Sequence, residues 1–290
     1  MSASAMGPLV AVGVDGSPQS RDALRWAARD AALRQARLRI VTAVPPLVGA
    51  WLAAPVPVGV LEWEKESAQC VLDEAAQLVK DVTDGSVPVT TSLHSGSAVP
   101  TLVDLSAEAD LVVVGRSGRN AVSRALLGSV SSGVLHRAHC PVAVVDYERP
   151  PDSKPPVLVG VDGSRSGERA LAIACQEASL RGVDVIAVHA WGALGAGELT
   201  GTGIDELSRD LDHWLAEQVE PWRRRYPAVT FHRRVLREPP ARCLAEFPEP
   251  VQLVVVGSHG YGGFAGMLLG SVSHGVVQSA RVPVIVACKH

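Results

Sequence analysis

The chain repeats itself, and this repetition limits the folds open to it more than any other feature. The repeated strings keep the same order and nearly the same spacing, which chance matches between Val- and Gly-rich segments would not do. We therefore interpret the chain as two copies of one structural unit. The strings are VGVDGS at 12–17 and 159–164, LVVVG at 111–115 and 253–257, LGSVS at 127–131 and 269–273, and PV at 141–142 and 283–284.

The length agrees with this interpretation, because 290 residues leave room for about two ordinary domains, each able to bury its own core. The segment 146–156 is charged and rich in proline, which is typical of a stiff surface linker. We predict one domain over residues 1–147 and a second, of the same kind, over residues 154–290.

Short runs rich in Val and Leu alternate along each copy with longer amphipathic stretches, which favours parallel strands joined by helices. The fold class that we predict is α/β, with two tandem open parallel five-stranded sheets and helices on both faces. Ser17 and Pro18 suit the N-cap and first position of the first helix. Strands are expected at 9–14, 38–44, 88–93, 110–114 and 141–145, helices at 18–35, 62–82, 97–108 and 129–138, and second-copy strands at 157–161, 184–190, 229–235, 252–256 and 283–287.

The composition argues against several classes of protein. A net charge of -3 provides no basic field for nucleic acid or anionic lipid. No apolar stretch reaches the roughly 20 residues of a membrane span, and the N-terminus lacks the basic start of a signal peptide. The five cysteines form no CxxC pair, which indicates free thiols. We expect a cytoplasmic protein that binds neither membrane nor nucleic acid.

A glycine-rich loop follows the fourth predicted strand of each copy. Glycines permit close approach of backbone to a ligand and positive φ angles, and successive N–H groups in such a loop can form an anion-binding nest. The loop then leads into a helix whose N-terminus favours a phosphate, while nearby serine hydroxyls can bond a phosphate or cap the helix. The alternative is that these glycines only make tight turns. In the first copy the elements are Gly115, Arg116, Ser117, Gly118, Arg119, Gly128, Ser129, Val130 and Ser131, and in the second Gly257, Ser258, His259, Gly260, Tyr261, Gly270, Ser271, Val272 and Ser273.

The other motifs in the sequence are weaker indications of function than the glycine loops. No G-x4-G-K-[ST] string occurs, which argues against a P-loop enzyme. His136, His139 and Cys140 have a metal-like spacing, but we favour histidines at a helix C-terminus beside a packed thiol, because structural zinc normally takes four ligands. His259 can touch a phosphate or lie in solvent.

The spacing G-x2-G-x9-G-S, together with VGVDGS at the first strand end, resembles the ATP-binding branch of the universal stress protein family. The resemblance extends over both copies, as in the tandem members found in mycobacteria and related actinobacteria. It implies a parallel sheet with strand order 3-2-1-4-5, ATP as ligand with any Mg²⁺ carried by the nucleotide, and a homodimer.

The same resemblance implies the roles of individual residues. The loop glycines and serines would hold the phosphates and ribose, and a strand-end aspartate would meet the nucleoside. The backbone at the end of the second strand would face the adenine. Outside the two glycine loops, the residues implied are Gly13, Asp15 and Ala43 in the first copy and Gly160, Asp162 and Ala190 in the second.

The function that we favour from these features is ATP-binding regulation in a stress response, with one nucleotide site per copy and weak ATP hydrolysis at most. Fast phosphoryl transfer needs a positioned base or water, a metal and a cationic clamp, and no such assembly is recognisable. Two alternatives remain open: a slow ATPase or adenylyl-transfer enzyme on the same fold, and an interaction module without bound ATP. The sequence does not identify a downstream partner protein.

The two loops differ in charge. The first contains Arg116, Arg119 and Arg124, whereas the second contains no arginine or lysine. Because arginines add charge-assisted contacts to a polyphosphate, we predict tighter and more salt-sensitive ATP binding in the first copy.

Overall fold

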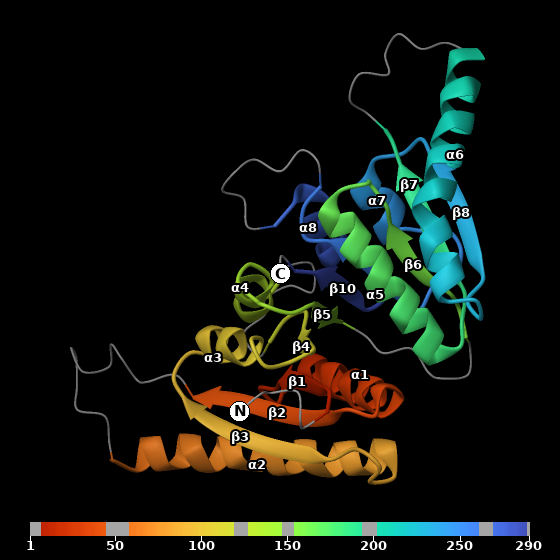
Figure 1. Ribbon diagram of the computed structural model, residues 1–290. Helices are drawn as coiled ribbons and strands as arrows, with labels where there is room; N and C mark the ends of the chain where they lie inside the picture. Colours follow the sequence, from red (N-terminus) through yellow and green to blue (C-terminus); the bar gives the residue numbers. More distant parts are fainter. Residues whose placement is uncertain are drawn as a thin grey trace, which may run out of the picture. The chain divides into compact units, whose positions relative to one another are not determined.

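The fold is taken from a computed structural model, which describes residues 7–44, 58–118, 127–146, 154–192, 202–260 and 269–288. The chain divides into two compact units, one extending to Glu148 and the other starting at Arg149 (Figure 1). Each unit is an alternation of strands and helices, and each is described in turn.

The first unit has its strands in the order β3-β2-β1-β4-β5, and every pairing that joins them is parallel. This order matches the 3-2-1-4-5 arrangement expected from the resemblance. The elements are β1 (Leu9–Gly13), α1 (Pro18–Arg34), β2 (Arg37–Val44), α2 (Val58–Thr83), β3 (Val89–Ser95), α3 (Ala98–Leu105), β4 (Leu111–Gly115), α4 (Ser129–Leu135) and β5 (Val142–Val145).

The second unit repeats the arrangement, with strand order β8-β7-β6-β9-β10 and parallel pairings throughout. The elements are β6 (Val157–Gly160), α5 (Arg165–Arg181), β7 (Val185–Ala190), α6 (Thr202–Arg225), β8 (Phe231–Leu236), α7 (Pro240–Ala245), β9 (Leu253–Gly257), α8 (Ser271–Ser279) and β10 (Val284–Ala287). The predicted α/β class with parallel strands is therefore confirmed in both copies.

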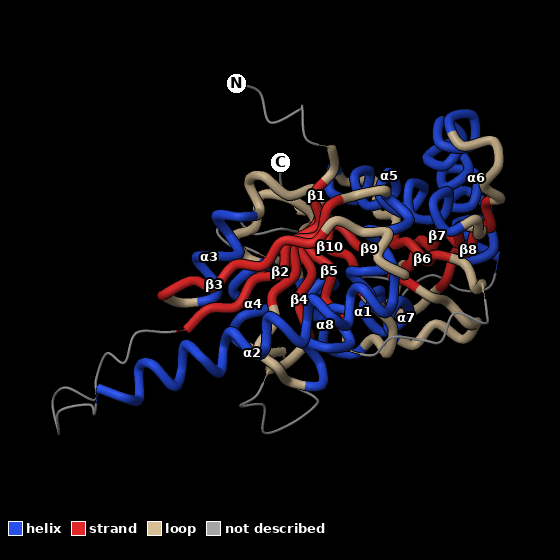
Figure 2. Tube along the Cα trace, turned by 90° about the horizontal axis from the view of Figure 1, so that it is seen from below, coloured by secondary structure: helices blue, strands red, loops and turns tan. Residues whose placement is uncertain are grey.

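The helices of each unit form two layers, because the direction of strand addition reverses after the third strand and right-handed crossovers then pass over the other face. In the first unit α1 packs on α2, and α3 packs on α4 (Figure 2). Strands β1, β4, β6 and β9 lie between the layers, and all but their last residues are buried. That burial on both faces explains their continuous apolar sequences.

The first helix of each unit begins at a well-defined cap. Ser17 caps α1 by accepting a hydrogen bond from the Ser20 N–H at 3.2 Å, and Pro18 occupies the first turn, as predicted. The residue before each cap is a glycine with positive φ, 80° at Gly16 and 79° at Gly163. Only glycine adopts this conformation without strain, so the Asp-Gly-Ser string is a turn as well as a candidate binding element.

Some predicted boundaries move by a few residues. The helix expected at 62–82 spans Val58–Thr83, and those expected at 97–108 and 129–138 end at Leu105 and Leu135. The shorter end of α3 has a visible cause, because the Ser106 hydroxyl bonds the carbonyl of Val103 and competes with the helical pattern.

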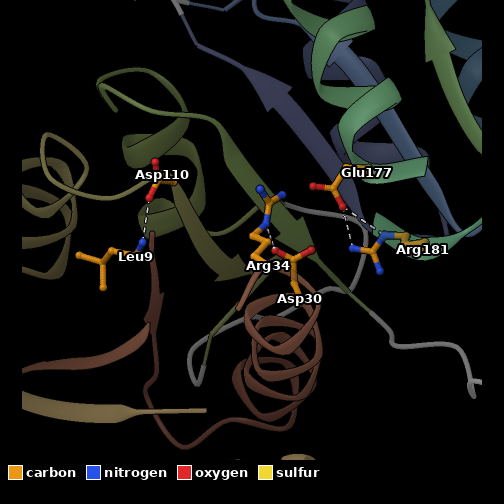
Figure 3. A network of polar contacts seen from close by, with 6 residues as sticks. All are labelled: Leu9, Asp30, Arg34, Asp110, Glu177 and Arg181. Atoms are coloured by element: carbon orange, nitrogen blue, oxygen red, sulfur yellow. Dashed lines mark hydrogen bonds and ion pairs between the residues drawn. The ribbon is translucent and has the colours of Figure 1, made fainter. Parts of the chain in front are cut away.

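Figure 3 shows polar contacts that fix elements within each unit. Asp110 accepts a hydrogen bond from the Leu9 N–H at 2.8 Å and so ties the start of β1 to the turn before β4. Asp30 in α1 and Glu177 in α5 are fully buried, and each bonds an arginine one turn later, Arg34 at 2.6 Å and Arg181 at 2.8 Å. Such charges are tolerated in the interior only when they are paired.

All five cysteines are free, as predicted, and all but Cys70 are buried. None of the helices within the described residues combines the length and the apolarity that a membrane crossing requires.

Candidate functional site

A cavity of about 300 Å³ opens at the carboxyl ends of β6, β7 and β9 in the second unit. Its size lies at the lower end of the range found for small-molecule sites, about 300–1,000 Å³. The described residues that line it are Gly160, Val161, Asp162, Gly167, Val188, Ala190, Pro240, Leu244, Val256, Gly257, His259, Gly260, Gly270, Ser271, Val272 and Ser273.

This wall brings together most of the candidate residues of the second copy. The strand-end aspartate, the end of β7, both halves of the glycine loop and the first turn of α8 all face one space. Ser258 is buried and does not line the cavity, and Tyr261 lies outside the described residues.

Several wall residues were missed by the sequence reasoning. Val188 lies two positions before Ala190 on β7, so strand periodicity alone could have placed it on the same face. Gly167 could have been suspected as a glycine in the first turn of α5. Pro240 and Leu244 come from α7, a short helix without a recognisable motif, and nothing in the sequence pointed to them.

In both units the strand-end aspartate lies directly against the second glycine of the loop. A β-carbon built on Gly260 would lie 2.7 Å from Oδ2 of Asp162, and one built on Gly118 would lie 2.5 Å from Oδ2 of Asp15. The other carboxylate oxygen is used in the turn, where Oδ1 accepts the N–H of Ser164 or Ser17 at 2.9 Å. Each aspartate therefore both caps the turn and faces the glycine loop.

The other loop glycines allow close packing. A β-carbon on Gly257 would lie 2.8–2.9 Å from Ser166 at the start of α5, and one on Gly115 would lie 3.1 Å from Gln19 at the start of α1. Described loop glycines such as Gly118 do not have positive φ. At these residues the close approach of a helix or a carboxylate, and not a positive φ, requires glycine.

The serines two residues into α4 and α8 have structural bonds. Ser131 and Ser273 are buried, and their hydroxyls donate to the strand-end carbonyls of Gly115 at 2.6 Å and Gly257 at 2.5 Å. These bonds hold the helix start against the strand end. The more exposed Ser129 and Ser271 keep hydroxyls at the first helical position, and Val130 and Val272 follow them.

The N-terminus of α8 provides backbone donors to the cavity. Its cap residue, Gly270, has no side chain to accept from the first turn, and the first helical bond is that from the His274 N–H to the Gly270 carbonyl. The preceding N–H groups of Ser271, Val272 and Ser273 therefore have no acceptor within the helix, and all three residues line the cavity. The first-unit counterpart, α4, starts in the same way after Gly128.

Arg116 is buried and turned toward β5. Its Nε lies 3.7 Å from the carboxylate of Asp146, and its backbone N–H and C=O bond Val145 and Gly128. Burial lowers the pKa of the Arg116 guanidinium, and the neighbouring Asp146 opposes that shift. Because this charge is matched within the unit, the structure gives no support to Arg116 as a phosphate contact.

The remaining candidates are placed as follows. Gly13 and Gly160 leave room for leucines, since a β-carbon there would lie 2.9 Å from Leu102 and 2.7 Å from Leu244. Ala43 is at the carboxyl end of β2, in the position that Ala190 takes on β7. Ser117 is buried beneath Gly128, and Arg119 lies outside the described residues.

His259 is partly exposed in the second loop, with its ring Nδ1 3.2 Å from the Ser258 hydroxyl. Of the histidines with the metal-like spacing, His139 donates its backbone N–H to the Ser106 hydroxyl at 2.8 Å. Across the described part of the chain, no cluster of His, Cys, Asp or Glu is arranged to hold a metal ion.

The comparisons with known proteins agree with this arrangement. The model of the universal stress protein family matches residues 9–146 and again residues 155–287. A universal stress protein of Mycobacterium tuberculosis is 47% identical over 285 residues, covering 96% of this chain and 95% of the relative. One from Mycolicibacterium smegmatis is 45% identical over 282 residues, covering 96% of both chains.

The crystal structure of a universal stress protein from Archaeoglobus fulgidus superposes with a TM-score of 0.71, covering 97% of this chain and 96% of that one. Its sequence is only 21% identical, so this likeness concerns the fold alone.

Proposed function

Since the chain belongs to the universal stress protein family, we propose that it is an ATP-binding regulatory protein of the stress response with one nucleotide site in each repeat. The observation that carries the proposal is the cavity of the second unit, in which Asp162, Ala190, Gly260 and the start of α8 meet. A glycine cradle next to an uncapped helix N-terminus suits a phosphate, and an apolar wall suits a base.

The chemistry of the residues that line the cavity indicates which part of the nucleotide each would contact. The N–H groups of Ser271 and Val272 would receive a phosphate, and the apolar side chains of Val188 and Leu244 would pack against the base. The Asp162 carboxylate would accept hydrogen bonds from hydroxyl groups of the nucleoside. In the first unit Asp15, Gly118 and the start of α4 would take the same roles.

The residues that line the cavity support ATP binding rather than rapid ATP hydrolysis. The described residues of this lining supply backbone donors, the Asp162 carboxylate and the side chains of His259 and Ser271, but no lysine or arginine to clamp a γ-phosphate. A Mg²⁺ ion prefers several oxygen ligands, and a single carboxylate fits an ion that arrives on the nucleotide phosphates.

Calorimetric titration of the full chain with ATP tests the proposal, with two sites per chain as the expected stoichiometry. Mass spectrometry of the freshly purified and then denatured protein separates the alternatives. Carried-over ATP supports the regulatory site, whereas ADP or AMP supports slow turnover. A chain with no bound nucleotide and no heat of binding would support the interaction module instead.

We extend the proposal to the setting of the protein: a cytoplasmic homodimer whose nucleotide-binding domains span residues 1–147 and 154–290. The five free thiols support a reducing compartment, since proteins of oxidising compartments commonly form disulfides. Light scattering on the eluting protein measures the mass directly, and a monomeric mass at micromolar concentration would reject the homodimer.

A further inference from the structure

A second cavity, of about 200 Å³, lies between helices α1 and α2 of the first unit, and we call it the interhelical cavity. Its walls come from the turn after β1, the first turns of α1 and the second half of α2, so it extends along the helices away from the strand ends. None of its lining residues is assigned to the nucleotide site, although Val14 and Ser20 adjoin Asp15.

The interior of the interhelical cavity is apolar. Its aliphatic lining residues are Val14, Leu24, Val71, Ala75 and Leu78. The hydroxyl of Ser20, which also lines the cavity, already donates to the Ser17 carbonyl at 2.9 Å. Because that hydroxyl is satisfied within the turn, the interior favours an apolar group over a polar one.

Two arginines line the exposed side of the interhelical cavity. Arg21 and Arg25 are four residues apart on α1 and therefore project from the same face of the helix. Arg21 reaches across to Glu74 on α2 at 3.1 Å, and the two side chains are 53% and 66% exposed. Arg25 pairs with Asp22 on its own helix at 3.0 Å. Ion pairs this exposed contribute little to stability, so each guanidinium can exchange its carboxylate for that of a ligand.

The charge of the lining favours an anionic ligand. Its charged members are Arg21, Arg25 and Glu74, which leaves one positive charge in excess, and Asp22 does not line the cavity. Arginine binds a carboxylate through two parallel N–H donors, and the contact with Glu74 places one carboxylate between the two helices already. An organic cation would instead meet two guanidinium groups.

The second unit indicates that the fold does not require these arginines. Helices α1 and α5 both have 17 residues and both start after a capping serine, so their residues correspond one to one. At the positions of Arg21 and Arg25, α5 has Glu168 and Ala172. The pair of arginines is therefore particular to the first unit and is not needed to form the helix.

We propose that the interhelical cavity is a second ligand site, which binds a small amphipathic carboxylate with its apolar body inside and its charge on Arg21 and Arg25. At about 30 Å³ for each water-sized group, the cavity accommodates an apolar body of about seven such groups. Octanoate has a chain of this size and serves as the probe. The inference does not depend on the proposed nucleotide-binding function.

The test is an NMR titration of the full chain, labelled at its valine and leucine methyl groups, with octanoate and without nucleotide. The signals of the aliphatic lining residues should shift, whereas those of Val188 and Leu244 in the second-unit cavity should not. Octanamide is the neutral analogue of the same length. It should bind about tenfold more weakly, because it lacks the charge that the two guanidinium groups contact.

Substitutions test the role of each charge. Arg21→Gln combined with Arg25→Gln should move the affinity ratio of octanoate to octanamide toward one. Glu74→Gln should strengthen octanoate binding about twofold, because it removes the anion that competes for Arg21. Arg224→Gln is the matched control, since Arg224 makes a similarly exposed ion pair with Glu220 at 3.1 Å on α6, and it should change neither affinity.

Val71→Phe and, independently, Leu78→Phe fill the cavity and should abolish the binding of both probes in chains that melting curves show to be folded. Octanoate binding that survives both substitutions, or methyl shifts confined to the second-unit cavity, would overturn the site. Equal affinities for octanoate and octanamide, or a ratio that the double arginine variant leaves unchanged, would overturn the recognition of a carboxylate. The titration with ATP tests the nucleotide sites separately, so the two proposals stand or fall independently.

Discussion

The carboxylate of Asp162 occupies the space that a side chain on Gly260 would need, since Oδ2 lies 2.7 Å from the position of a β-carbon there. Asp15 and Gly118 repeat the relationship in the first unit at 2.5 Å. Real β-carbons do not approach an oxygen this closely, so the aspartate can hold this position only because its neighbour in the loop is a glycine. The first strand of each unit is thereby linked to the loop that follows the fourth.

The first prediction concerns Gly118→Ala and Gly260→Ala. A single methyl group should displace the aspartate, so each substitution should abolish or strongly weaken binding at its own site and leave the other site intact. Calorimetric stoichiometry with ATP should fall from two to one per chain. Gly59→Ala is the control, because a β-carbon at Gly59 would meet nothing within 4 Å. Two-site binding in the Gly118→Ala, Gly260→Ala double variant would reject the assignment of both sites.

The second prediction separates the two roles of Asp15. Asp15→Ala removes the acceptor of the Ser17 N–H and should cost about 1 kcal/mol of unfolding free energy, in addition to weakening nucleotide binding. Asp15→Asn keeps an acceptor for that N–H, so it should weaken binding while leaving stability nearly unchanged. Melting curves without nucleotide and titrations with ATP measure the two effects. Unchanged affinity in both variants would leave Asp15 as a turn cap alone.

The third prediction is that Arg116 stabilises the first unit and does not bind phosphate. Arg116→Ser leaves Asp146 without its ion pair and should cost about 1–3 kcal/mol of unfolding free energy. Adding Asp146→Cys reproduces the pair Ser258 and Cys288 of the second unit and should recover part of that loss.

In either variant the ATP affinity of the first site, and its dependence on salt, should stay the same once Gly260→Ala has blocked the second site. Arg119 and Arg124 would then cause the salt dependence of ATP affinity that the sequence predicts. The double substitution Arg119→Ser, Arg124→Ser should reduce that dependence. A salt slope that changes with Arg116→Ser instead would show that its charge reaches the ligand.

The fourth prediction concerns thiols and pH. Burial raises the pKa of Cys175 to about 12, of Cys243 to about 11 and of Cys288 to about 12. Only the exposed Cys70 should therefore react rapidly with a maleimide in the native protein, and Cys70→Ser should abolish that reaction. Rapid labelling of a second thiol would contradict the burial.

The same pKa shifts determine how the free energy of unfolding changes with pH. In the unfolded chain these thiols lose their protons at about pH 9, whereas in the folded chain they keep them to higher pH. The buried protonated thiols therefore add to the free energy of unfolding below about pH 9, and this stabilisation is lost as the pH rises toward 12. Cys175→Ala should make the decline in unfolding free energy above pH 9 less steep, which denaturant titrations at several pH values can measure.

Much of the fold could be predicted because its signals are local and occur twice. The runs at 111–114 and 253–256 are apolar throughout, which favours strands in the middle of a sheet that helices cover on both faces. The strand-end aspartates and the loop glycines also appeared as fixed strings. Their proximity follows from topology, since the carboxyl ends of neighbouring parallel strands meet at one edge.

What the sequence could not provide depends on contacts between distant residues. Nothing in the neighbourhood of Arg116 reveals that its charge pairs with Asp146 across β4 and β5, and its place in the glycine loop suggested a phosphate contact. Pro240 and Leu244 likewise line the cavity because α7 packs on α8 and on strands β6 and β7. Side-chain direction in a loop, and the placement of a short helix, are decided by tertiary packing rather than local pattern.

The last prediction concerns that packing of α7 on α8. A β-carbon on Gly275 would lie 2.9 Å from the β-carbon of Ala241, so the two helices are in contact here and leave no space for a larger side chain at either position. Helix propensity alone predicts that Gly275→Ala stabilises the protein by about 1 kcal/mol. We expect the opposite sign, a loss of about 1–3 kcal/mol of unfolding free energy, because overpacking must push the helices apart.

Since α7 carries Pro240 and Leu244, its displacement should also weaken nucleotide binding in the second site and leave the first site unchanged. Ala241→Gly makes room for the new methyl group. By itself it should destabilise the protein by about 1 kcal/mol, as glycine does within a helix. Combined with Gly275→Ala it should restore most of the lost binding and give a favourable coupling energy in the double-mutant cycle. Additive losses in that cycle, with no recovery of binding, would mean that the two helices adjust freely and that their close approach does not shape the cavity.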